Sequence, residues 1–148
     1  MKKIFLVVIT SLVIFTISNA QELGVRFGNV SAGNVAIDGI FSVSKFSRMH
    51  ADVSFGNGGV GADLLWDFLY RPLGGEALNW YLGAGAYINI DDPFLFGAAF
   101  EAGLEYRFKE VPIAIGMDWR PTLSIVETTD FHVEGFGLNV RYVFGKKK

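Results

Sequence analysis

Apolar and polar residues alternate with a period of two along most of the chain after residue 20. This period is typical of β-strands whose two faces meet different surroundings. It is clearest in five segments, at residues 60–71, 80–89, 96–108, 113–119 and 136–144, and none of the positions on their apolar faces is charged. We therefore predict a strand in each of these five segments.

The N-terminal part shows the same alternation more weakly, at residues 23–28, 35–44 and 49–55. These segments bring the predicted number of strands to eight, the smallest even number that bacterial outer-membrane barrels use. Many of the segments are close to the 9–11 residues with which a tilted strand crosses a bilayer. The pattern predicts an all-β fold, an eight-stranded antiparallel up-and-down transmembrane β-barrel.

The charged residues of these strands gather on the faces that also carry the glycines. An eight-stranded barrel has an interior just wide enough for side chains to fill, and small residues beside long arginines and carboxylates suit it. Arginine, not lysine, accompanies the carboxylates, and its planar fork pairs well with them when buried. We predict a charge network in the lumen, made of Arg26, Asp38, Asp52, Asp63, Asp67, Arg71, Glu101, Glu105, Arg107, Asp118, Arg120 and Arg141. A soluble lipocalin-like carrier with the faces reversed stays the alternative.

The breaks between strands predict two ends of the barrel. Turns are expected at 45–48, 72–78 and 109–112 at the periplasmic end, and loops at 29–34, 57–59, 91–93 and 122–130 at the other. Aromatic residues then fall at one level near the periplasmic end, as in the girdles of membrane barrels. The predicted girdle consists of Tyr70, Trp80, Tyr106, Phe108, Tyr142 and Phe144.

The first 20 residues have the pattern of a secretory signal peptide. Lys2 and Lys3 precede an apolar run, and Ser18, Asn19 and Ala20 supply small residues before Gln21. We expect a signal peptide at 1–20, a barrel at 21–148 and an outer-membrane location. The chain has no cysteine and a net charge of −2, which argues against a disulfide framework, a thiolate metal site and nucleic-acid binding. We expect a monomer in contact with outer-membrane lipid.

The stretch from Gly137 to Phe144 resembles the C-terminal strand of outer-membrane barrels, although here Gly145 and three lysines follow the last aromatic residue. The segment Asp118-Trp119-Arg120-Pro121 is similar to the penultimate strand of small porin-family barrels. In size the chain resembles the OmpA/OmpX-type eight-stranded group. That resemblance implies a structural, envelope-stabilising or surface-interaction role, and recognition of the last strand by the barrel-insertion machinery.

No catalytic, cofactor or metal site is expected. His50, Asp52 and Ser54 share one strand face, but residues i and i+4 of a strand are about 13 Å apart, too far for hydrogen-bonded catalysis. Glu134 stands two residues after His132, where the lipid A deacylases, whose architecture this chain resembles, carry a serine. Pairing with arginine is the simpler role for Asp63 and Asp67. A membrane-embedded lipid A-modifying hydrolase stays an alternative, and we expect the charge network to plug any pore.

Overall fold

The computed structural model describes residues 21–56, 59–91, 93–126 and 129–145, together with Lys3, Ile4, Val7 and Ser11. The predicted signal peptide therefore lies almost entirely outside the described residues. The same holds for parts of three predicted loops, namely Asn57 and Gly58, Asp92, and Glu127 and Thr128. The described residues contain no apolar helix with the length that a membrane span requires.

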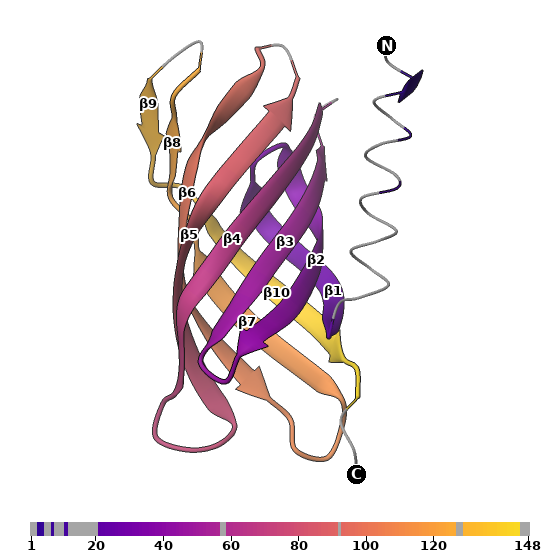
Figure 1. Ribbon diagram of the computed structural model, residues 1–148, viewed down its shortest axis with the longest axis vertical. Helices are drawn as coiled ribbons and strands as arrows, with labels where there is room; N and C mark the ends of the chain where they lie inside the picture. The colour runs from indigo at the N-terminus through magenta and orange to yellow at the C-terminus, as the bar shows by residue number, and fades with distance from the viewer. Residues whose placement is uncertain are drawn as a thin grey trace.

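Eight strands close into an antiparallel barrel, as the alternation predicts (Figure 1). They are β1 (Glu22–Val30), β2 (Gly33–Ser44), β3 (Ser47–Gly56), β4 (Gly59–Pro72), β5 (Leu78–Ile90), β6 (Leu95–Arg107), β7 (Ile113–Trp119) and β10 (Phe136–Val143). Consecutive strands pair from β1 to β7, β7 pairs with β10, and β10 pairs with β1, which closes the ring. Because no strand of this ring is left with an open edge, the backbone groups of the barrel wall are paired within the wall.

A short hairpin begins within the segment 122–130, where the sequence predicts a loop, so that prediction is wrong for Thr122–Ser124 and for Asp130. Strand β8 (Thr122–Ser124) pairs with the upper part of β6, and β9 (Asp130–His132) pairs with β8. Figure 1 shows this hairpin beside the upper end of β6. Strand β7 ends at Trp119, which pairs with Ala102 of β6. The hairpin pairs with the part of β6 above this point and so extends the wall there. The β-branched and apolar residues at its start suit a strand.

A β-bulge in β4 changes which side chains face inward near the lower end of the barrel. Trp66 pairs with Ala84 and Leu69 with Leu82, so that Asp67 and Phe68 oppose the single residue Gly83. One extra residue on a strand exchanges the two faces beyond it. Tyr70 pairs with the buried Tyr81 and faces the lumen.

The interior of the barrel is charged and its outer face is apolar. The largest fully buried side chains include those of Arg26 and Arg141, whereas Phe100, Trp66 and Leu138 each leave 45–59% of their surface exposed. The apolar cluster described inside is small, comprising Leu65, Tyr87, Ala99 and the partly buried Leu95. The barrel is thus packed in the sense opposite to a protein with a hydrophobic core.

Candidate functional site: the charged interior

Ten of the twelve residues predicted to form the lumenal network are buried. They are Arg26, Asp38, Asp52, Asp63, Asp67, Glu101, Glu105, Asp118, Arg120 and Arg141. The other two lie elsewhere. Arg107 is at the lower rim, with 30% of its side chain exposed. Arg71 was wrongly predicted, because the bulge turns it outward, where its guanidinium lies 3.7 Å from the centre of the Phe46 ring.

Several buried or partly buried residues of the network were missed by the sequence analysis. Glu22 precedes the first clear alternation, and Arg48 was assigned to a turn although it lies inside β3. Tyr70 was placed in the girdle. Asn139 and Tyr81 are buried as well, and both were on faces that the alternation already marked as polar. Alternation gives no signal of the register shift in β4 that turns Tyr70 inward.

Arg141 organises the lower part of the interior. Its Nε donates to Glu22 Oε2 at 3.1 Å and its Nη1 to Asp38 Oδ2 at 2.9 Å, and its Nη2 donates to Glu105. Tyr70 donates its hydroxyl hydrogen to Glu105 Oε1 at 2.9 Å. Arg107 pairs with both Glu22 and Glu105, so the network continues to the rim.

Arg48 links this lower part to the middle of the barrel. Its Nε donates to Asp67 Oδ2 at 2.8 Å and its Nη1 to Glu105 Oε2 at 2.9 Å. The guanidinium lies between two tyrosine rings, 4.3 Å from the centre of Tyr70 and 4.5 Å from that of Tyr81. Contact with ring faces favours the cation, so Arg48 is held by charge and by stacking together.

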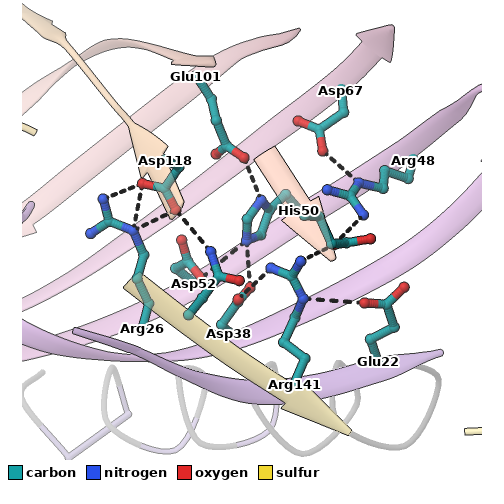
Figure 2. A network of polar contacts seen from close by, with 12 residues as sticks. Glu22, Arg26, Asp38, Arg48, His50, Asp52, Asp67, Glu101, Asp118 and Arg141 are labelled. Carbon is teal, nitrogen blue, oxygen red and sulfur yellow. Dashed lines mark hydrogen bonds and ion pairs between the residues drawn. The ribbon is translucent and has the colours of Figure 1, made fainter. Parts of the chain in front are cut away.

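His50 occupies the centre, with a carboxylate at each ring nitrogen. Its Nδ1 lies 2.8 Å from Glu101 Oε1, and its Nε2 contacts Asp38 Oδ1. Asp52 Oδ1 is 3.7 Å from Nε2. Figure 2 shows the ring between Glu101 and Asp38, with Arg48 and Asp67 to one side. A neutral imidazole carries a hydrogen on one nitrogen only and so donates a single hydrogen bond. Because each ring nitrogen of His50 faces a carboxylate, both contacts are hydrogen bonds only when the ring is protonated on both nitrogens.

The upper part of the interior holds two further arginines. Arg120 Nη2 lies 2.7 Å from Glu101 Oε2, and Arg120 Nη1 donates to Asp52. Arg26 donates to both oxygens of Asp118, from Nε to Oδ1 at 2.9 Å and to Oδ2 at 3.1 Å, and from Nη2 to Oδ1 at 2.5 Å. Both side chains of the Arg26–Asp118 pair are fully buried.

Negative charge exceeds positive charge inside the barrel. Among the described residues, eight carboxylates are buried, those of Glu22, Asp38, Asp52, Asp63, Asp67, Glu101, Glu105 and Asp118. Four guanidiniums are buried with them, and Arg107 adds a fifth at the rim. Even with a protonated His50, negative charges exceed positive ones by two. Isolated charges are costly at low dielectric, so protons or a cation are needed to balance the interior.

Five of the six predicted girdle residues lie on the outer face. Tyr106, Phe108, Tyr142 and Phe144 leave 36–51% of their surface exposed, and Trp80 pairs across from the outward Leu104. They form edge-to-face pairs, Tyr106 with Phe108 at 5.0 Å and Tyr142 with Phe144 at 5.1 Å between ring centres. Tyr70 is the exception and was wrongly assigned, because the bulge in β4 turns it into the lumen.

The interior can hold charge, bind a cation or block passage, and its described contacts lack a nucleophile poised beside His50. The groups that form ion pairs with the two ring nitrogens are the carboxylates of Asp38, Asp52 and Glu101. Ser54, on the same strand, accepts instead a hydrogen bond from the backbone N–H of Ala32 at 3.2 Å. Comparison with known proteins adds no family: no family model, curated protein or solved structure matches the chain.

Proposed function

We propose that this chain is an integral outer-membrane β-barrel with a structural, envelope-stabilising or surface-interaction role, and that its charge network plugs the lumen. The observation that carries the proposal is the inverted packing. Arg26, Arg141 and Asp38 have 0–1% of their surface exposed, while Phe27, Trp66 and Tyr142 have 51–52%. Water is a poor solvent for a surface of this kind and lipid is a good one.

The extent of the apolar surface supports the same proposal. Large hydrophobic side chains are exposed on every strand of the ring except β5. Soluble monomers rarely expose contiguous apolar patches of more than a few hundred Å². A soluble lipocalin-like carrier needs its aromatic rows inside, which is the inverse of the arrangement described above.

A plugged lumen is supported by the side chains that cross it. Arg48, Arg120 and Arg141 each bind carboxylates on two or more other strands. Barrels of about eight strands have interiors that side chains fill, whereas aqueous channels need 16–18 strands. We therefore propose a role without ion conduction, and expect no steady channels when the pure protein is added to planar bilayers.

The role that we propose is not enzymatic. Hydrolysis of a lipid by a serine–histidine pair needs the two side chains within hydrogen-bond reach, and the described partners of His50 are carboxylates. Mass spectrometry of lipid A from cells with and without the protein tests this point. An altered acyl pattern in the cells that have the protein contradicts the proposal and favours the hydrolase.

Membrane insertion is tested by gel migration and fractionation. We expect the detergent-extracted protein to run at different positions on gels before and after heating, because a closed barrel resists SDS at room temperature. We also expect it in the outer-membrane fraction as a monomer, after removal of residues 1–20 and insertion through its last strand. Recovery of a folded protein in the aqueous fraction contradicts the proposal.

A further inference from the structure

His50 and two carboxylates converge in the middle of the lumen from strands that are not all neighbours. His50 lies on β3, Asp67 on β4 and Glu101 on β6. Each offers one ligand atom, and the three atoms lie within 4.8 Å of one another. All three residues have at most 2% of their surface exposed. We call these three residues the His50 triad.

The second oxygen of each carboxylate in the triad is held by an arginine. Arg48 Nε donates to Asp67 Oδ2 at 2.8 Å, and Arg120 Nη2 lies 2.7 Å from Glu101 Oε2. The oxygens Asp67 Oδ1 and Glu101 Oε1 are left for another partner. Glu101 Oε1 faces His50 Nδ1, and Asp67 Oδ1 has no hydrogen-bond partner among the described residues. A fully buried carboxylate oxygen without a partner is costly, which points to a missing partner at this place.

The other ring nitrogen of His50 is oriented as it is in many metal sites. Nε2 contacts Asp38 Oδ1, and Asp38 is held in turn by Arg141 Nη1, 2.9 Å from Oδ2. Histidines that bind metals usually donate their second N–H to a carboxylate, which fixes the tautomer and the ring orientation. With Nε2 protonated against Asp38, the lone pair of Nδ1 points to the side of Glu101.

We propose that the His50 triad binds one divalent transition-metal ion of the Zn²⁺ class, through His50 Nδ1 and one oxygen each of Asp67 and Glu101. One imidazole and two carboxylates form a donor set that zinc uses, with a water completing the coordination. The ion takes the place of the proton on Nδ1, and this proton leaves to the solvent. A dication in place of a single proton adds one net positive charge, which lowers the excess of negative charge inside the barrel from two to one.

The triad is more suitable than the alternative on the opposite side of His50. Asp38 and Asp52 also approach the ring, and Asp52 Oδ1, like Asp67 Oδ1, has no hydrogen-bond partner among the described residues. Both oxygens of Asp38, however, already have partners, namely His50 and Arg141. A hollow of about 790 Å³ opens at the lower rim and is lined by Glu22 and Arg107, which belong to the network.

Metal counting on the folded protein tests the site. The full barrel is refolded into detergent after treatment with a chelator, exposed to Zn²⁺, dialysed, and analysed by elemental mass spectrometry. We expect about one zinc per chain for the native protein, and no displacement by Mg²⁺ or Ca²⁺, which prefer all-oxygen sites. His50→Gln and Asp67→Asn are expected to lower the occupancy at least tenfold.

Two variants serve as matched controls. His132→Gln changes the chain's only other histidine, which is exposed and lies on β9, and Asp118→Asn changes a buried aspartate that pairs with Arg26. Both are expected to keep one zinc. A folded native protein that takes up no zinc overturns the proposal, and so does undiminished uptake by folded His50→Gln.

Two further outcomes are decisive. Loss of zinc in Asp52→Asn with retention in Asp67→Asn places the ion at the other ring nitrogen and overturns the assignment. Loss of heat-modifiable migration shows that a variant has failed to fold, and in that case X-ray absorption of the zinc-loaded native protein is the deciding measurement. One imidazole among nitrogen and oxygen ligands supports the site, and the absence of an imidazole contradicts it. These measurements use the folded protein in detergent and do not depend on its location in the cell. A negative result therefore overturns the zinc site without contradicting the proposed membrane location.

Discussion

Replacing Arg26 by methionine isolates the electrostatics of one buried pair. Arg26 and Asp118 contact each other through three short distances, and both side chains are fully buried. In Arg26→Met, the charge of Asp118 keeps one described hydrogen-bond partner, the side-chain amide of Asn139. Its Nδ2 donates to Asp118 Oδ2 at 3.1 Å. Breaking a buried pair in this way costs about 3–5 kcal/mol of unfolding free energy.

The double variant Arg26→Met/Asp118→Leu separates the pair from its surroundings. Removing both charges is often nearly neutral, because no buried charge is left alone. Arg26 also donates hydrogen bonds to the carbonyls of Asn29 and Gly135, at 2.8 and 3.0 Å. Gly135 O keeps the hydrogen bond from the backbone N–H of Arg120 at 2.9 Å, and Asn29 is exposed, so losing these two bonds costs only about 0.5–1.5 kcal/mol each. We expect the double variant to be more stable than the sum of the single effects by about 2 kcal/mol or more.

Urea titration of the barrel refolded into lipid vesicles measures these free energies, with tryptophan fluorescence and gel migration as two readouts of the same transition. Asp118→Leu alone completes the double-mutant cycle. If Arg26→Met changes the unfolding free energy by less than about 1 kcal/mol, or if the two single effects simply add, then the pair is hydrated and the account of a dry, charge-filled lumen is refuted.

Four further substitutions, one of them a matched control, test the faces of the wall. Phe100→Arg puts a charge on the outward face of β6, where Phe100 is 45% exposed, and is expected to cost about 2–4 kcal/mol in lipid; urea titration in vesicles checks it. Gly103→Val adds atoms that overlap the buried ring of Tyr81, so we expect a loss of about 1–3 kcal/mol, visible as a lower urea midpoint. Tyr70→Phe removes hydrogen bonds with Glu105 and Arg107, so it should lower the unfolding free energy by about 1–3 kcal/mol. The control Tyr106→Phe, on the outer face, should change it by less than about 0.5 kcal/mol. Equal effects of these two substitutions contradict the inward placement of Tyr70.

The strands and most of their faces can be predicted from alternation because the period of side chains along a strand is two. Phe96 to Phe108 shows this well, since its apolar and charged positions separate along the whole segment. The bulge at Asp67 and Phe68 cannot be found in this way. It exchanges the faces within one strand, so Tyr70 and Arg71 each fall on the face opposite to the predicted one.

The interior contacts depend on closure of the barrel, which alternation along single strands does not contain. His50 on β3 meets Glu101 on β6 because the wall curves until non-neighbouring strands face each other. Arg48 and Glu22 were missed because each lies at the beginning of its strand, where alternation is not yet established. Arg48 follows a turn, and Glu22 is the first residue of the barrel. The hairpin of β8 and β9 was missed because three-residue strands are too short to show a period.

Quenching of the native tryptophans tests the central claim, that the outer face of the barrel meets hydrocarbon. All three tryptophans, Trp66, Trp80 and Trp119, lie on that face. In vesicles whose acyl chains carry bromine, we expect their fluorescence to be strongly quenched, and acrylamide in the water to have little effect. Quenching by acrylamide with no effect of the brominated chains would show a barrel surrounded by water and would contradict the account.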